Sequence, residues 1–210
     1  KKVSSGQRLN REAAAYGSRL KAGTTGAANP LHKFTRRRAL AHFPSQAMAQ
    51  RVLDTYFLEG GRAEGQPYRP HPTLTISPRR AALELSLCGN FSEVWLAKEG
   101  HAGTVGINLL EKIQTANLSA ILGAMLADVD YVIMGAGVPR EIPRVLTEYA
   151  SHRTGHITID VINSTTTHRA ALNPVTMLGD ELPPLRRPNF LAIVTLHVLA
   201  DYLNRDPEIR

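Results

Sequence analysis

Hydrophobic and polar residues follow a regular pattern only after residue 44. Residues 1–44 mix small polar and basic residues without a sustained period, so no element is predicted there. Ser45 can then cap a helix that Gly60 and Gly61 end. The apolar residues of this helix recur at helical spacing: Ala49, Val52, Leu53 and Tyr56. Residues 61–80 contain four prolines and are expected to form an extended connection.

From about residue 83, short apolar runs alternate with amphipathic helical stretches. The predicted strands are residues 83–88, 105–109, 131–134, 156–162 and 190–195. Helices are predicted after four of these runs, and the clearest one has a continuous apolar stripe within residues 118–126. Residues 163–188 are loop-rich, with room for one short strand or a hairpin. This alternation is typical of βα units on a parallel sheet, and it leaves open a barrel or an open doubly wound sheet.

The bulk composition is that of a folded globular chain. With 210 residues, 43% of them hydrophobic, the chain can bury a substantial core in one or at most two domains. The single cysteine, Cys88, excludes an internal disulfide framework and suits a reducing compartment. No apolar run approaches the ~18 residues of a membrane span, and the first residues lack a signal-peptide core. We therefore expect a soluble cytoplasmic protein with no membrane partner.

The net charge of +7 is unevenly distributed along the chain. Residues 1–80 hold 15 Lys and Arg against 4 Asp and Glu, whereas residues 81–210 hold 10 against 14. The basic residues thus belong to the least regular part of the sequence, where a loosely packed charged arm is a simpler interpretation than a phosphate-binding surface. We divide the chain into a divergent basic segment, residues 1–44, and a domain, residues 45–210. A nucleic-acid partner is not expected.

Ligands of parallel α/β proteins bind beyond the carboxyl ends of the strands, which directs attention to two places. Gly135-Ala136-Gly137 follows a predicted strand and lets the backbone pass close to a planar or phosphorylated ligand. A plain strand-to-helix turn explains it equally well, because the full dinucleotide fingerprint is missing. Asn108, at the end of another strand, can offer an amide donor and acceptor to a heterocycle or can cap its own loop.

Other chemistries find less support in the sequence. The eight histidines are scattered, so we expect no metal site. Cys88 lies in an apolar run, which indicates a buried structural thiol. Glu111, Lys112 and Gln114 are interpreted as solvated loop residues. A glycine-flanked nucleophilic serine and a phosphate-binding loop with its lysine are both missing, which disfavours hydrolases and NTPases.

Four stretches of the chain share an order and spacing that are specific. They are residues 90–101 (NFSEVWLAKEGH), 105–114 (VGINLLEKIQ), 123–127 (GAMLA) and 130–139 (DYVIMGAGVP). Together they closely resemble the nitronate monooxygenases, formerly called 2-nitropropane dioxygenases. A looser likeness runs from Ala39 to Arg210.

The resemblance implies an α/β fold of the (β/α)8 TIM-barrel type that binds FMN non-covalently at the carboxyl ends of its strands. It also implies the oxidation of alkyl nitronates by molecular oxygen to a carbonyl compound and nitrite. By motif match, Asn108 would contact the isoalloxazine ring. The residues expected to line the cofactor face are Met134, Gly135, Ala136 and Gly137, with Thr195 as a further candidate.

Two departures from the family pattern affect these expectations. Residues 1–29 do not reproduce the family's first strand and its Gly/Met-rich loop. The family's Gly-rich segment, with the histidine proposed as catalytic base, would lie beyond Arg210. Because a complete barrel needs ~250 residues, we expect a truncated form with the N-terminal four or five βα units and no assigned catalytic residue. An unpaired edge and an uncovered apolar face would favour self-association.

Two alternative functions stay open. The flavin-dependent enoyl reductases of polyunsaturated fatty acid and polyketide synthesis resemble the same motifs. A non-catalytic module, in which the basic first 80 residues contact nucleic acid or an acidic partner, would instead show strongly salt-dependent binding.

Overall fold

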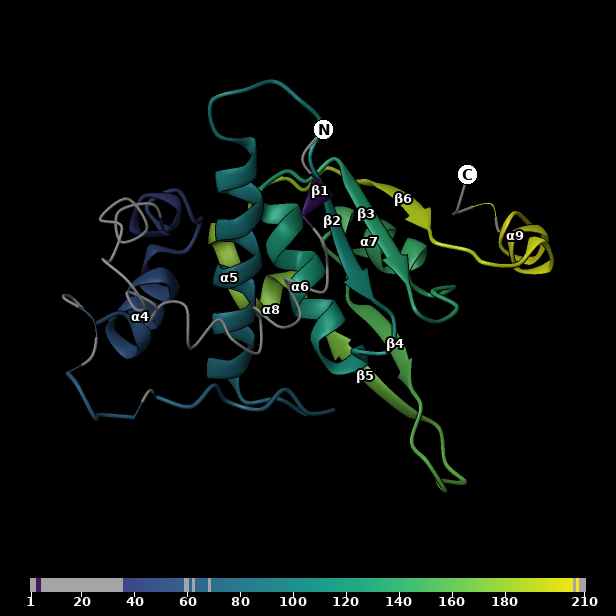
Figure 1. The fold of residues 1–210 in the computed structure, drawn as a ribbon, viewed down its shortest axis with the longest axis horizontal. Helices are drawn as coiled ribbons and strands as arrows, with labels where there is room; N and C mark the ends of the chain where they lie inside the picture. The colour runs from purple at the N-terminus through teal and green to yellow at the C-terminus, as the bar shows by residue number, and fades with distance from the viewer. Residues whose placement is uncertain are drawn as a thin grey trace.

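The computed structural model describes residues 3–4, 36–58, 61, 63–67, 69–205 and 207. They form a mixed α/β structure in which helices pack beside a small sheet and a separate hairpin (Figure 1). The helices are α4 (Gln46–Tyr56), α5 (Arg80–Lys98), α6 (Gln114–Leu126), α7 (Ile142–Ala150), α8 (Pro174–Leu178), the 3-10 helix η1 (Gly179–Glu181) and α9 (His197–Leu203). The strands are β1 (Val3–Ser4), β2 (Gly106–Leu110), β3 (Tyr131–Gly135), β4 (Gly155–Ile159), β5 (His168–Leu172) and β6 (Asn189–Ala192).

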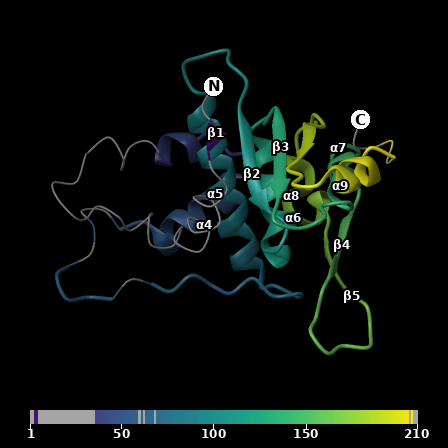
Figure 2. The ribbon, with the colours of Figure 1, turned by 45° about the vertical axis from the view of Figure 1, so that its right-hand side comes forward.

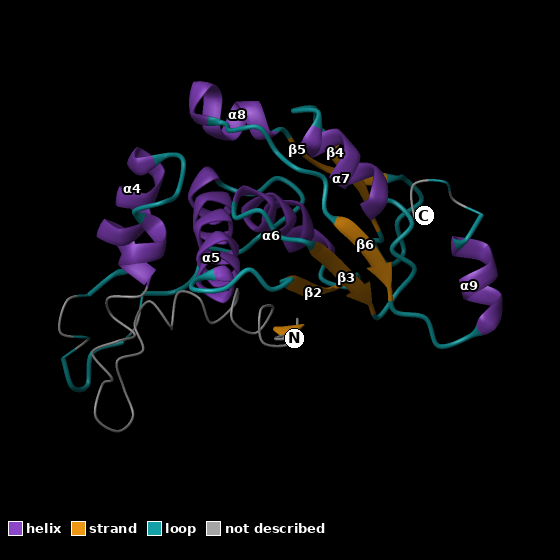
Figure 3. Ribbon diagram, turned by 90° about the horizontal axis from the view of Figure 1, so that it is seen from above, coloured by secondary structure: helices purple, strands orange, loops and turns teal. Residues whose placement is uncertain are grey.

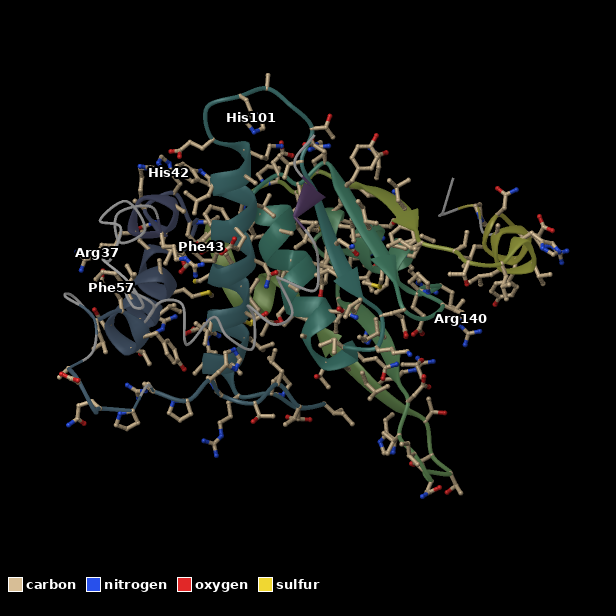
Figure 4. All side chains as sticks on the ribbon, viewed as in Figure 1. Arg37, His42, Phe43, Phe57, His101 and Arg140 are labelled. Carbon is tan, nitrogen blue, oxygen red and sulfur yellow. The ribbon has the colours of Figure 1, made fainter. Side chains whose placement is uncertain are left out.

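Helix α4 confirms the helix predicted after Ser45. The Ser45 hydroxyl accepts a hydrogen bond from the Met48 N–H at 3.3 Å, as a helix-capping serine does. Most of the basic segment 1–44 lies outside the described residues. Its described end belongs to the core, because Leu40 and Phe43 are almost fully buried and the Phe43 ring meets Phe91 of α5 edge-on at 5.0 Å (Figure 4).

The strand predicted at residues 83–88 is wrong, because Arg80–Lys98 form the single helix α5. This helix contacts both α4 and α6, so it is apolar on more than one side, and Leu85, Leu87 and Cys88 are all fully buried. A short apolar run does not distinguish a buried strand from a buried helix. The contact with α6 is close at Gly123, where an added Cβ would lie 2.5 Å from the Leu87 carbonyl oxygen.

The four strands of the main sheet are all parallel, in the order β1-β2-β3-β6. The predicted strands at residues 105–109, 131–134 and 190–195 are confirmed, with small shifts at their ends. Strand β4 does not join this sheet and pairs antiparallel with β5. The loop-rich segment after β4 therefore contains the second strand of a hairpin, one of the two possibilities predicted for it. Figure 2 shows this hairpin extending away from the sheet. The described sheet is open, and it is not a closed barrel.

The sheet has two faces that differ in burial. We call one the Leu109 face: Ile107 and Leu109 of β2, Val132 and Met134 of β3, and Phe190 and Ala192 of β6. We call the other the Asn108 face: Gly106, Asn108 and Leu110 of β2, Tyr131, Ile133 and Gly135 of β3, and Asn189 and Leu191 of β6. Helix α6 packs against β2, and the four Leu109-face residues of β2 and β3 are fully buried. On the Asn108 face, Leu191 is 48% exposed.

The C-terminal part of the described chain exposes many of its side chains. Helix α9 confirms the helix predicted after residue 195, and only Leu203 on it is buried. Several large apolar side chains between β6 and the end of α9 are exposed: Ile193, Val194, Leu196, Val198 and Tyr202. Self-association through this surface stays a prediction. None of the described helices combines the length and apolar character needed to cross a lipid bilayer.

Candidate functional site

The carboxyl ends of β2, β3 and β6 meet at one edge of the sheet because the three strands are parallel. Asn108 lies two residue pairs before this edge. It is paired with Ile133 on β3, which is in turn paired with Leu191 on β6, so the three residues lie on the same face. Gly135 ends β3 two residues beyond Ile133. The two predicted places, Asn108 and the turn after β3, therefore belong to adjacent strands and the same side of the molecule.

The Asn108 side chain has an unsatisfied polar atom. Its Oδ1 is buried and has no hydrogen-bond partner among the described residues. A buried amide oxygen without a partner costs about 1–3 kcal/mol, which makes such atoms rare in folded proteins. Ile133, its partner on β3, has an apolar side chain and offers no donor. A ligand with an N–H group at this position would remove the cost.

The turn after β3 is strained at its middle residue. Ala136 has φ of +59°, in the left-handed region where a side chain is disfavoured by about 1–2 kcal/mol. The glycines on either side are required by packing within the chain. A Cβ on Gly135 would lie 2.9 Å from the Ile193 Cβ, and a Cβ on Gly137 would overlap the Glu111 carboxylate. Strained backbone of this kind concentrates at functional sites.

A polar network that the sequence interpretation missed joins the loops at this edge. The sequence had suggested that Glu111 and Gln114 are solvated loop residues, but both are half-buried. The Glu111 N–H donates to the Gly135 carbonyl oxygen at 2.9 Å, which ties the loop after β2 to the end of β3. Gln114 Nε2 lies 3.4 Å from Glu111 Oε1, and its Oε1 accepts from the Asp160 N–H at 3.0 Å. Two polar residues three positions apart directly after a strand were the available signal.

The remaining predicted site residues are placed less favourably. The Met134 side chain is fully buried on the Leu109 face, so only its backbone is available near Asn108. Thr195 is exposed, three residues beyond the end of β6. Ala136 is exposed and Gly137 is half-buried in the loop that follows β3. The structure thus brings together Asn108 and Gly135 most closely and leaves Thr195 at the periphery.

Two side chains with clearly shifted pKa values, Asp130 and Cys88, lie away from this edge of the sheet. Asp130 precedes β3 at the opposite, amino edge of the sheet. Burial alone would raise the pKa of Asp130, but the Val105 N–H, Lys98 and Arg186 outweigh burial and lower it. Burial raises the pKa of the Cys88 thiol, which fits a structural residue and not a nucleophile.

Comparison with known proteins adds no assignment. The chain matches no model of a known protein family, no curated protein and no solved structure. Within the described ranges, no group of three or more His, Cys, Asp or Glu side chains is arranged to hold a metal ion. Asn108, its surroundings and the sequence motifs in which they lie are therefore the basis for a proposed function.

Proposed function

We propose that this protein is an FMN-dependent oxidoreductase of the nitronate monooxygenase type, which oxidises alkyl nitronates with molecular oxygen. The observation that carries the proposal is the buried amide oxygen of Asn108 on a parallel sheet, which has no partner among the described residues and lies beside the strained turn that starts at Gly135. Both features fall within the motifs that resemble this family. We place the protein in the cytoplasm, as its single cysteine favours.

The arrangement of strands and helices supports a (β/α)8-barrel form. Strands β2, β3 and β6 follow one another across the sheet in sequence order. Helices α6 and α7 contact each other and lie on the same side of these strands (Figure 3). A doubly wound sheet reverses its strand order and carries helices on both faces, whereas a barrel keeps its helices outside. On this proposal, the Asn108 face corresponds to the inner face of the barrel.

The residues on the Asn108 face fit the chemistry of a flavin ring. The isoalloxazine edge carries N–H donors and carbonyl acceptors, and Asn108 offers an unpaired acceptor. The apolar side chains of Ile133 and Leu191, which follow Asn108 in one row across β3 and β6, suit a flat aromatic surface. Gly135 and Gly137 contribute less than the motif suggested, because Ile193 and Glu111 already fill the space beside them.

Bound FMN would supply the redox chemistry, accepting an electron from the substrate anion and passing it to oxygen. The residues of this chain would bind and orient the ring. Asn108 would fix the orientation of the ring by hydrogen bonding to its edge. Ile133, Leu191 and Ile193 would exclude water, which strengthens that hydrogen bond. We assign no catalytic base among the described residues.

The activity is tested on the full chain with an alkyl nitronate, following nitrite release and oxygen consumption together. We expect both, and we expect Asn108→Leu to abolish most of the nitrite signal. Asn189→Leu is the matched control, because Asn189 lies on the same face at the amino end of β6. If the nitronate is inert while an enoyl thioester drives NADPH oxidation, the enoyl reductase alternative replaces this proposal.

A further inference from the structure

A basic groove lies outside the proposed flavin site. It has a volume of about 1110 Å³ and is formed by α7, the hairpin strands β4 and β5, and the end of α9. Figure 2 shows these elements gathered on one side of the molecule. Five arginines line it: Arg140, Arg144, Arg153, Arg169 and Arg205. The side chains of His152 and His156 add two further nitrogen-bearing rings.

The acidic residues of the groove are already engaged within the chain. Glu148 pairs with Arg153 at 2.6 Å and lies 3.9 Å from Arg144. Glu141 accepts hydrogen bonds from the Thr158 N–H at 2.7 Å and the Thr158 hydroxyl at 3.0 Å. Among the described residues, these two carboxylates are the only acidic side chains that line the groove, so its five arginines outnumber them.

Two of the arginines have no competing partner. The side chains of Arg169, on β5, and Arg205, after α9, are exposed and make no hydrogen bond or ion pair within the described part of the chain. Arg140, labelled in Figure 4, also lines the groove, as does Tyr202 of α9. Guanidinium groups from different elements that line one concavity suit a ligand that carries phosphate or carboxylate groups.

We propose that this groove is a binding site for a small molecule that carries two or more phosphate groups. A guanidinium group binds phosphate oxygens through two parallel N–H donors, and several such groups at one place can neutralise a multiply charged ligand. The volume of about 1110 Å³ is enough for a ligand of nucleotide size. The inference rests on the groove alone and does not require the proposed flavin activity.

The test is a calorimetric titration of the full chain with inorganic pyrophosphate at fixed ionic strength. We expect saturable binding, weakened at least about tenfold in the double variant Arg169→Gln/Arg205→Gln, because charge-assisted hydrogen bonds are lost. Arg79→Gln is the matched control: Arg79 is exposed, lies outside the groove and makes no capping hydrogen bond with its side chain. It should bind pyrophosphate as the unchanged protein does, and all three should melt at the same temperature.

Several results would overturn the proposal. Absence of pyrophosphate binding, or equal weakening by Arg79→Gln, would show that the groove is not a specific phosphate site. Tighter, groove-dependent binding of double-stranded DNA would make nucleic acid the ligand. Flavin content measured in the same variants separates this site from the flavin site: loss of FMN together with pyrophosphate in the double variant would show a single shared site.

Discussion

The two faces of the parallel sheet are built from the same three strands, yet they differ in what covers them. On the Leu109 face, Ile107, Leu109, Val132 and Met134 are fully buried in the helix-covered core. On the Asn108 face, the neighbouring positions include an amide whose oxygen has no partner in the described part of the chain and a leucine that is 48% exposed. Strand residues alternate between faces, so the same segments can serve stability on one side and binding on the other.

This difference separates residues that hold the fold from residues that are free to serve a ligand. A buried position contributes through packing, and its replacement is felt throughout the core. A half-exposed position beside an unpaired polar atom contributes little to the fold as it stands.

The largest effect is expected from truncating a leucine on the buried face. Leu109→Ala should lower the free energy of unfolding by about 3 kcal/mol, because it removes buried methyl groups and leaves a cavity. Leu191→Ala, on the half-exposed face, should cost less than about 1 kcal/mol. Urea unfolding measures both. Equal losses would mean that the two faces do not differ in the way described.

A smaller but specific effect is expected where α5 and α6 meet. Gly123→Ala should cost about 2 kcal/mol, because its Cβ would lie 2.5 Å from the Leu87 carbonyl oxygen and the backbones must separate. Gly106→Ala, on the Asn108 face, is the control, since its Cβ would only reach ordinary contact at 3.4 Å. Thermal denaturation of the two variants tests this, and a Gly106→Ala variant as unstable as Gly123→Ala would count against it.

The helix layer also contains a buried ionic contact that depends on pH. Glu84 of α5 is nearly buried, with Arg51 Nη2 at 2.7 Å and Arg80 Nε at 2.9 Å from its Oε1. Burial alone would raise the pKa of Glu84, but the two arginines outweigh burial and lower it. Stability from this carboxylate is therefore present above the unfolded-state pKa of about 4.3 and is lost as the pH falls through the lower folded-state pKa.

We expect Glu84→Gln to cost about 1.5 kcal/mol at pH 7 and less at pH 3, where protonation of Glu84 begins to remove the contribution of its charge. Chemical unfolding of both proteins at the two pH values measures the difference. A cost that is the same at both pH values would assign the effect to packing and not to the charge of Glu84.

The smallest effect, of opposite sign, is expected at the edge turn. Ala136→Gly should raise the free energy of unfolding by about 1 kcal/mol, because glycine adopts the φ of +59° without strain. Gly137→Ala, one residue on, should destabilise the protein, since its Cβ would overlap the Glu111 carboxylate. Thermal denaturation distinguishes the two variants. An Ala136→Gly variant no more stable than the unchanged protein would show that the turn is not strained.

The sequence predicted those parts of the fold in which local pattern and tertiary packing agree. The strands around Asn108 and Met134 and the helix capped by Ser45 are examples. The run Leu83–Cys88 was wrongly predicted as a strand. Helix α5 is buried on more than one side, and a helix in that position has no polar face to reveal its period. The antiparallel pairing of β4 with β5 depends on contacts that no local period encodes.

The candidate site was predictable only in part, for a similar reason. Its location at the carboxyl edge follows from parallel topology alone. The unpaired Oδ1 of Asn108 depends on which side chains surround it, and the position of Glu111 against Gly137 depends on how two loops meet. The face on which the Met134 side chain lies is set by the register of β3 with β2. The sequence alone does not give this register.

A fluorescence titration of FMN shows whether the Asn108 face binds this cofactor. We predict that the full chain quenches FMN fluorescence with saturation and that Asn108→Leu weakens binding by about tenfold or more while Asn189→Leu does not. If FMN fails to bind, or binds equally well to the Asn108→Leu variant, the Asn108 face is not an FMN site.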